Sequence, residues 1–145
     1  MITGALIIAA SIEPQAGQDM TKAVPLIAVI DDDESVREAI ENLMKWLGLR
    51  SQAFSSAIDF LASGRIEEIS CIIADVHMPR MSGIEMRKRM VGLGHRVPTI
   101  LITAFPNEAD RARAVADGVI CYLSKPFDNN DLIDCIRSVL NLSPG

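Results

Sequence analysis

Five polar side chains able to hold a metal ion or take part in phosphoryl transfer stand directly after apolar runs of the sequence. They are Asp31, Asp32, Asp75, Thr103 and Lys125. Asp75 follows an apolar run at 71–74 and precedes Pro79 and Gly83, which predicts a buried strand that ends in a tight loop. An Asp there also suits a turn or a helix cap, so Asp75 alone does not define a site.

Apolar patterning predicts strands that alternate with helices. Strands are expected at 25–30, 50–54, 71–75, 97–102 and 119–123, and helices at 34–47, 55–63, 83–91, 106–117 and from Asp128 onward. We expect a capping box from Ser35 to Glu38, and Pro106 in the first turn of its helix. Such alternation requires an α/β fold, with a five-stranded parallel sheet covered by helices on both faces.

The carboxyl ends of parallel strands share one edge of the sheet, so the five polar residues should converge there. Three neighbouring carboxylates cannot all stay ionised without a counter-charge, and Mg²⁺ is a cation that prefers such oxygen ligands. A carboxylate can also accept a phosphoryl group and form an aspartyl phosphate. Mg²⁺, the Lys125 ammonium and the Thr103 hydroxyl would then neutralise the phosphoryl oxygens.

With these residues in place, the chain closely resembles the receiver domain of two-component response regulators, of the chemotaxis-regulator type. The resemblance runs from about Pro25 to Leu142, within an expected domain at 24–142, and rests on four motifs in the family's order. They are Asp31-Asp32, Asp75-Val76-His77-Met78-Pro79, Thr103-Ala104 and Lys125-Pro126-Phe127. It implies a flavodoxin-like, doubly wound (βα)5 fold with strand order 2-1-3-4-5, and a signalling domain rather than an enzyme.

The resemblance also implies the roles of the site residues. Asp75 would be the phosphoacceptor, helped by Lys125 and Thr103, and the donor would be a sensor histidine kinase or phosphotransfer protein. Asp32, Asp75 and the backbone carbonyl of His77 would bind Mg²⁺ directly, with Asp31 acting through water. Asp33 falls outside this set and is expected to cap the following helix.

The resemblance further implies a conformational switch. Thr103, Ala104 and Tyr122 would form it, with Tyr122 turning inward when Thr103 moves toward the phosphoryl group. The Lys125–Pro126 peptide bond would be cis. We also expect His77 and Phe105 to tune how easily water reaches the acyl phosphate. A homodimer or a downstream protein would use the fourth helix, fifth strand and fifth helix.

Composition narrows the function classes. The chain carries 14 Lys and Arg against 19 Asp and Glu, and a net charge of −5 argues against direct binding of nucleic acid. We expect reduced core thiols at Cys71, Cys121 and Cys135, in a cytoplasmic protein. Residues 1–23 are expected to be a disordered extension, with translation starting at Met1 or Met20, and 143–145 a short tail. The apolar run in that extension is shorter than the about 20 residues that span a bilayer.

Two other classes use related chemistry. A haloacid-dehalogenase-like phosphatase also uses Mg²⁺ and a strand-end Asp, but usually carries a second Asp where this chain has His77. A dinucleotide-binding domain would need Gly-x-Gly-x-x-Gly after the first strand, and the sequence has none there. The output stays open between a stand-alone receiver, favoured by the short end after residue 142, and the receiver part of a longer DNA-binding regulator.

Overall fold

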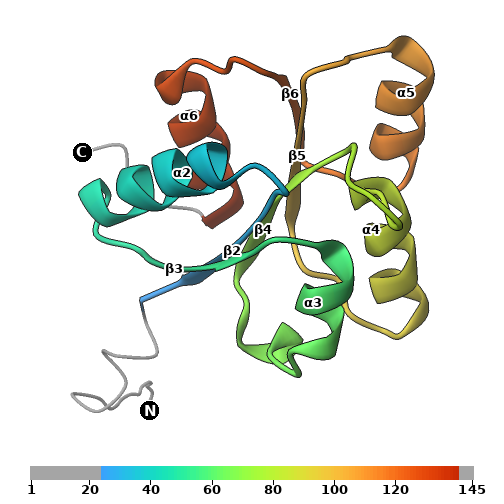
Figure 1. Cartoon of the computed structure of the whole chain (residues 1–145), viewed down its shortest axis with the longest axis horizontal. Helices are drawn as coiled ribbons and strands as arrows, with labels where there is room; N and C mark the ends of the chain where they lie inside the picture. The colour runs from blue at the N-terminus through green and yellow to red at the C-terminus, as the bar shows by residue number, and fades with distance from the viewer. Residues whose placement is uncertain (1–23, 141–145) are drawn as a thin grey trace, which may run out of the picture.

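The computed structural model describes residues 24–140 of the 145-residue chain. Five parallel strands form one sheet, with helices on both of its faces (Figure 1). The strands lie side by side in the order β3-β2-β4-β5-β6, which confirms the predicted order 2-1-3-4-5. The expected extension at 1–23 and tail at 143–145 lie outside the described residues.

The observed elements agree closely with the expected ones. The strands are β2 (Leu26–Ile30), β3 (Arg50–Phe54), β4 (Cys71–Asp75), β5 (Thr99–Thr103) and β6 (Cys121–Ser124). The helices are α2 (Glu34–Trp46), α3 (Ala57–Ala62), α4 (Gly83–Gly92), α5 (Glu108–Ala116) and α6 (Asn129–Leu140), with an unpredicted 3-10 helix η2 (Ile66–Glu68) between α3 and β4. Within residues 24–140, no helix combines the length and apolar character needed to cross a membrane.

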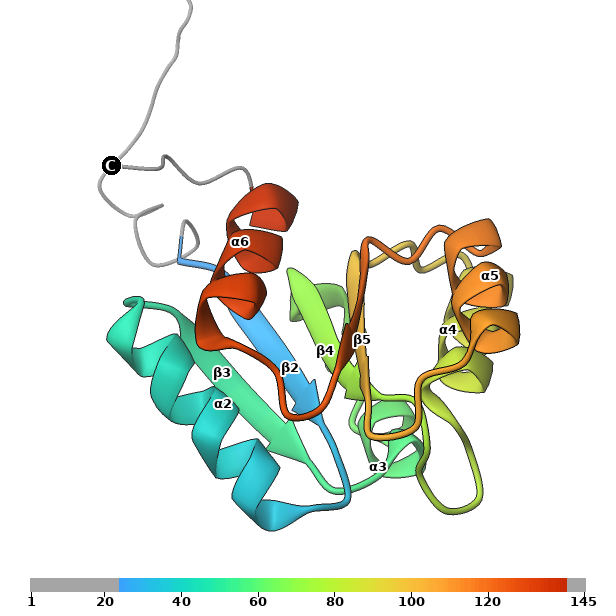
Figure 2. The same ribbon diagram turned by 90° about the horizontal axis from the view of Figure 1, so that it is seen from above.

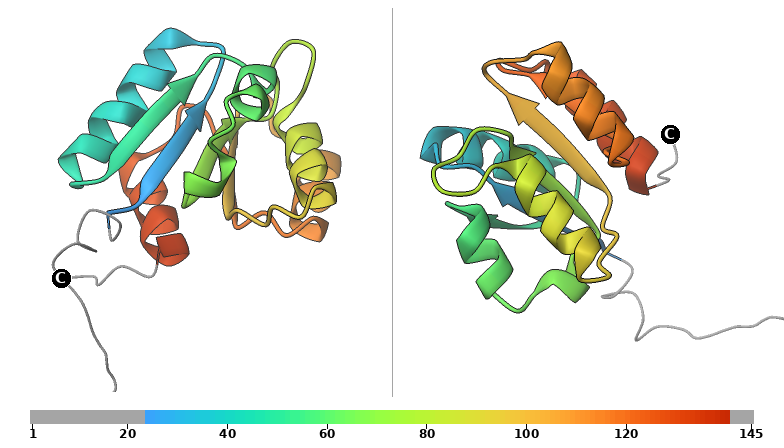
Figure 3. Two further views of the ribbon diagram at one scale, coloured as in Figure 1. Left: turned by 90° about the horizontal axis from the view of Figure 1, so that it is seen from below. Right: turned by 90° about the vertical axis from the view of Figure 1, so that its right-hand side faces the viewer.

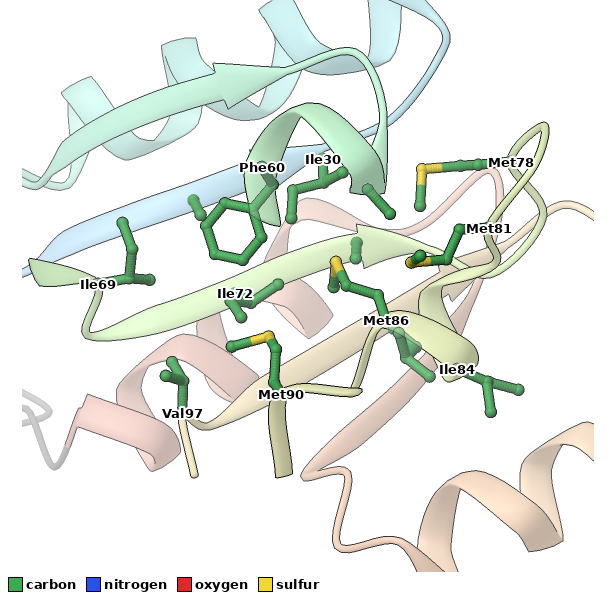
Figure 4. Close-up of a cluster of buried hydrophobic side chains, with 14 of the residues drawn as sticks. Ile30, Phe60, Ile69, Ile72, Met78, Met81, Ile84, Met86, Met90 and Val97 are labelled. Carbon is green, nitrogen blue, oxygen red and sulfur yellow. The ribbon is translucent and has the colours of Figure 1, made fainter. Parts of the chain in front are cut away.

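Two apolar cores lie on opposite faces of the sheet. Helices α2 and α6 cover one face, here called the α2–α6 face, and α3, α4 and α5 cover the other, the α3–α5 face (Figures 1 and 2). Successive residues of β4 supply both cores, because Ile73 packs on the α2–α6 face and Ile72 on the α3–α5 face. Figure 4 shows Ile72 beside Phe60 of α3 and Met90 of α4. The sheet is therefore held rigidly between two packed layers.

The strands all run in the same direction, as the arrows of β2 and β3 show in the left view of Figure 3. Every neighbouring pair of strands is parallel, with Ile30 of β2 opposite Ala74 of β4 and Asp75 opposite Ile102 of β5. The loops after β2, β4, β5 and β6 therefore leave the sheet at one edge. The fold thus brings the loops that carry the predicted site residues to one place.

Two details of the helix starts were predicted wrongly. Helix α2 is capped by Asp33, whose side chain accepts a hydrogen bond from the Ser35 amide at 2.9 Å, so the expected capping box from Ser35 does not form. Asp33 thus serves as the cap that the sequence indicated. Helix α5 is capped by Asn107, which places Pro106 before the cap instead of in the first turn.

The prediction of three reduced cysteines was wrong for two of them. Cys121 of β6 and Cys135 of α6 form a disulfide, with their Cα atoms 6.3 Å apart. Cys71 is free and fully buried, and its burial raises the pKa of the thiol to about 12. The pair comes together because α6 packs back over β6, which the 14-residue separation of the two cysteines does not reveal.

Gly83, the first residue of α4, contacts the end of β4 so closely that no side chain fits. A Cβ at this position would overlap the carbonyl oxygen of Asp75 and lie 3.1 Å from a Leu101 methyl carbon. We expect Gly83→Ala to lower the free energy of unfolding by about 2–3 kcal/mol, because backbone must move to relieve the overlap. Urea denaturation of the purified chain measures this change.

Gly92→Ala is the matched control, because a Cβ at the other end of α4 meets nothing within 4 Å. This control should be neutral or stabilising by up to about 1 kcal/mol. Equal stability of the two variants would contradict the close contact at Gly83.

Candidate functional site

Three acidic side chains meet at the carboxyl edge of the sheet. Asp31 and Asp32 follow β2, Asp75 ends the adjacent strand β4, and each offers a carboxylate oxygen within 4.8 Å of the others. Asp31 and Asp75 are buried, with exposed fractions of 0% and 5%, whereas Asp32 is exposed. Two of the three acids are therefore buried, and the third is open to solvent.

Lys125 joins the two buried acids. Its Nζ donates a hydrogen bond to Asp31 Oδ2 at 2.8 Å and another to Asp75 Oδ2 at 3.2 Å. The backbone amide of Lys125 also donates to the carbonyl of Thr103 at 2.7 Å, which fixes the start of the β6–α6 loop against the end of β5. The Lys125–Pro126 peptide bond is cis, as expected. Residues 50 and 94 positions apart are thus brought into direct contact.

The negative charges of this cluster outnumber its positive charge. Burial raises the pKa of the Asp31 carboxyl, although its hydrogen bond with Lys125 acts in the opposite direction. For Lys125, burial by itself would lower the pKa, but the hydrogen bonds and charges of Asp31 and Asp75 outweigh burial and raise it. Three carboxylates and one ammonium leave the group with an excess of two negative charges when all are ionised. The arrangement therefore suits a divalent cation.

Local hydrogen bonds hold the two buried acids in position. Asp31 Oδ1 accepts from the Asp33 amide at 2.9 Å, and the Asp31 carbonyl accepts from the Arg37 guanidinium at 2.7 Å. Asp75 Oδ1 accepts from the amide of His77 at 3.2 Å. Sequence reasoning missed Arg37, although its place in the second turn of the helix after the acids is compatible with such a bond.

Thr103 and Ala104 lie at the end of β5. Thr103 is fully buried, and its hydroxyl oxygen accepts from the amide of Phe105 at 3.0 Å. Its strand neighbours β4, where Asp75 pairs with the preceding residue, Ile102. Ala104 is exposed and lines a surface hollow together with Lys125. Thr103 thus ends the strand that neighbours Asp75, and Ala104 lies at the surface beside Lys125.

Tyr122 lies on β6 within the α3–α5 core. The residue is 8% exposed, and the Arg111 guanidinium of α5 stands 5.2 Å from the ring centroid. The Tyr122 hydroxyl is buried without a hydrogen-bond partner among residues 24–140. The side chain therefore occupies an inward position next to α5, within the part of the fold that the expected switch involves.

Two rings stand near the acid cluster. The His77 and Phe105 rings meet edge to face with their centroids 5.9 Å apart, and both residues are exposed. His77 Nε2 also lies 4.0 Å from Asp110 Oδ2 of α5. These contacts link the loop after β4 to the loop and helix after β5.

Comparison with known protein families gives the identity of this arrangement. The family described as response regulator receiver domain matches residues 27–137. The chain belongs to this receiver family. Receivers of this family are signalling domains of two-component systems.

Known receiver proteins are similar over most of the chain. Response regulator protein TmoT of Ectopseudomonas mendocina is 36% identical over 127 residues, which cover 88% of this chain and 58% of that protein. Transcriptional regulatory protein FixJ of Azorhizobium caulinodans is 34% identical over 124 residues, covering 86% and 58%. This receiver chain therefore spans little more than half the length of these relatives.

Solved structures give the same result. Response regulator StyR superposes with a TM-score of 0.76 at 37% identity, covering 82% of this chain and 60% of StyR. A receiver domain protein from Clostridium thermocellum also has a TM-score of 0.76, at 25% identity, covering 81% and 95%. The receiver fold thus accounts for the whole five-stranded sheet.

Removing the ammonium from the acid cluster tests the electrostatic arrangement. Lys125→Met should lower the free energy of unfolding at neutral pH by about 2 kcal/mol, because it leaves Asp31 buried without its charged partner. The pKa of Asp31 is already raised and would rise further, so the loss should shrink as pH falls toward the ordinary Asp value of 3.8. Urea denaturation across this pH range, without divalent cations, measures it.

Lys88→Met is the matched control, because Lys88 is exposed on α4. This variant should stay within about 0.5 kcal/mol of the wild type. The double variant Lys125→Met with Asp31→Asn should recover part of the loss. A Lys125→Met protein as stable as the Lys88→Met protein would count against the proposed charge pairing.

Proposed function

We propose that this receiver accepts a phosphoryl group on Asp75 from a sensor histidine kinase or phosphotransfer protein and then changes a protein-interaction surface. The observation that carries the proposal is the contact of Lys125 with both Asp31 and Asp75, beside the exposed Asp32. Because the chain belongs to the receiver family, the phosphatase and dinucleotide-binding alternatives are set aside. The proposed domain spans 24–142.

The chemistry requires little from the protein beyond position and charge. One oxygen of Asp75 attacks the phosphorus of the donor's phosphohistidine, the bond from phosphorus to nitrogen breaks, and the histidine leaves with its electron pair. Lys125 is placed to turn its ammonium toward the transferred group, and the His77 amide already faces the Asp75 carboxylate. The Thr103 hydroxyl supplies another donor. The reaction is self-catalysed by the receiver, which is not otherwise an enzyme.

The oxygen donors of the acid cluster fit Mg²⁺. Asp32, Asp75 and the backbone carbonyl of His77 are the proposed direct ligands, and Asp31 is proposed to act through water. The hard, all-oxygen donor set and its excess of two negative charges support this assignment. When bound, Mg²⁺ would neutralise charge on the phosphoryl oxygens.

Phosphorylation is proposed to act through Thr103, Ala104 and Tyr122 together. The Tyr122 ring is already inward in this structure, so the proposed effect on it is to hold it there instead of turning it inward. Thr103 would shift toward the phosphoryl group, and small Ala104 would leave room for this movement. The inward ring of Tyr122, packed beside Arg111 of α5, would then be held there. The rearrangement would thereby reach α5 and β6.

Two features support protein partners. A hollow of about 470 Å³ beside Lys125 has apolar walls, which suit docking of the phosphodonor protein. Apolar Val115 and Ile120, 62% and 50% exposed, lie at the end of α5 and before β6. The face formed by α5, β6 and α6 is the proposed surface for a homodimer or a downstream protein. We place this signalling in the cytoplasm.

The length of the relatives supports a second possible way for this receiver to act, as part of a longer protein. TmoT and FixJ are both much longer than the matched region, and the name of FixJ describes a transcriptional regulator. This receiver is therefore proposed either to act on separate partners or to form the receiver portion of a longer DNA-binding regulator. The net charge of −5 argues that the receiver itself does not contact DNA.

Asp75→Asn tests the phosphoacceptor directly. The wild type incubated with acetyl phosphate and Mg²⁺ should gain one phosphoryl group in intact-protein mass spectrometry, and Asp75→Asn should gain none. Asp33→Asn is the control that should still be modified, because Asp33 only caps α2. Equal labelling of the Asp75→Asn protein would contradict the assignment.

The two rings beside the site should control hydrolysis of the acyl phosphate. His77→Asn and Phe105→Glu should each change the half-life of the phosphorylated protein several-fold, because both rings are exposed and pack together there. Loss of radiolabelled phosphate over time gives the half-life. Ile120→Ala, outside this contact, is the control. Unchanged half-lives in both ring variants would disprove the role.

A further inference from the structure

The disulfide between Cys121 and Cys135 joins the two ends of the segment that carries Lys125. Cys121 is the first residue of β6 and directly precedes Tyr122, whereas Cys135 lies in the middle of α6. Their Cα separation of 6.3 Å lies within the range that a disulfide spans without backbone movement. Closing this bond makes a loop whose interior holds the β6–α6 turn, the part of the chain that presents Lys125 to Asp31 and Asp75.

The surroundings of the pair suit both oxidation states. Cys135 is 9% exposed and packs in the α2–α6 core with Leu132 and Ile136 of its own helix. Cys121 is half-buried and packs against the same core. Because a reduced cysteine packs as a small apolar residue, this core can accommodate two thiols as well as the bond. The half-buried position of Cys121 gives a small dissolved disulfide a route to the pair.

The third cysteine behaves differently. Cys71 lies in β4 with no exposed surface, and its Sγ stands 3.7 Å from the carbonyl of Ile72. Burial raises the pKa of this thiol to about 12, so almost none of it is the reactive thiolate at neutral pH. Cys71 is therefore an internal reference that should keep its thiol while the other two react.

We propose that Cys121 and Cys135 form a reversible redox site, whose oxidation fixes α6 against β6 and so restrains the loop that carries Lys125. In the cytoplasm, where the proposed function places this receiver, glutathione and thioredoxin reduce disulfides, and those that form are mostly transient or redox-sensing. The cytoplasmic setting and the link between oxidation and signalling rest on the proposed function. The redox chemistry and the restraint do not.

The oxidant is a small disulfide such as oxidised glutathione. The Cys121 thiolate attacks one of its sulfurs, which forms a mixed disulfide and releases one glutathione thiol. The Cys135 thiolate then attacks the Cys121 sulfur and releases the second glutathione thiol. Two electrons pass from the cysteine pair to glutathione, and the two thiol protons end on the two released glutathione thiols. Excess reduced glutathione reverses both steps.

The restraint acts on an edge of the sheet. Strand β6 is the last strand and pairs only with β5 among the described strands, and α6 rests on the sheet through one apolar face. Without the bond, the β6–α6 loop is held by its own hydrogen bonds and by this packing. With the bond, the two flanking elements cannot separate, so the openings that expose the loop's amides should become rarer.

Redox titration of the purified wild-type chain tests the site. The folded protein is equilibrated in glutathione buffers from fully reduced to fully oxidised, alkylated, and mapped by peptide mass spectrometry. We expect Cys121 and Cys135 to become protected together and to regain reactivity when reduced glutathione is in excess. Cys71 should be alkylated only after unfolding. The proposal would be overturned if no ratio of oxidised to reduced glutathione protected the pair, or if the bond persisted in excess dithiothreitol.

Hydrogen exchange of the same wild-type protein measures the restraint. Amides in residues 125–136 should exchange at least several-fold more slowly in the oxidised protein than in the reduced protein. The melting temperature of the oxidised protein should be several degrees higher. Cys135→Ser should lose both redox effects, and Cys71→Ser should keep them. Equal exchange and equal melting temperature in both oxidation states of the wild type would overturn the restraint.

A third experiment distinguishes failure of the redox proposal from failure of the proposed phosphoryl transfer. Acetyl phosphate and Mg²⁺ are added to the oxidised and reduced wild type, and the exchange of α6 is compared with that before addition. The phosphorylation-dependent change should be smaller in the oxidised protein, and equal changes would overturn the link to signalling. A chain that takes up no phosphate would disprove the proposed function and this link, and would leave the redox titration to stand by itself.

Discussion

The structure depends on an imbalance of charge that the fold itself creates. Two buried carboxylates, Asp31 and Asp75, share one ammonium from Lys125, and the exposed Asp32 adds a third negative charge within 4.8 Å. Burial makes these charges costly, because water can no longer screen them. A bound cation would stabilise a site in this condition, and with that cation in place the site would attract the proposed anionic phosphoryl group. The excess negative charge of the site is therefore the common basis of both proposed ligands, Mg²⁺ and the phosphoryl group.

Rigid packing maintains this imbalance. The β2 and β4 strands lie between two apolar cores, so Asp31 and Asp75 cannot move apart to relieve their repulsion. Gly83 allows α4 to begin directly against the carbonyl of Asp75, and Arg37 ties the carbonyl of Asp31 to α2. Apolar packing thus offsets the repulsion within a group of like charges, as functional sites often require.

Much of this site could be predicted because it follows from topology. Alternating strands and helices require parallel strands, and parallel strands place Asp75 and Lys125 at one edge although 50 residues separate them. The features that the sequence did not predict depend on contacts between side chains of elements that pack together. The disulfide of Cys121 with Cys135 arises from how α6 lies on β6, and no spacing rule covers it. The cap of α2 was assigned to both Asp33 and Ser35, and the acid prevailed because its carboxylate also accepts the Ser35 hydroxyl at 2.7 Å.

Thermal unfolding during a titration with Mg²⁺ tests most directly whether the gathered acids form a cation site. The melting temperature of the wild type should rise with Mg²⁺ and saturate, with about 2.7 kcal/mol of added stability at 100 times the dissociation constant. Asp32→Asn should lose most of this rise, and Asp131→Asn, an exposed acid on α6, should keep it. A melting temperature that does not change with Mg²⁺, or that rises equally in the wild type and in Asp32→Asn, would contradict a cation site at these acids.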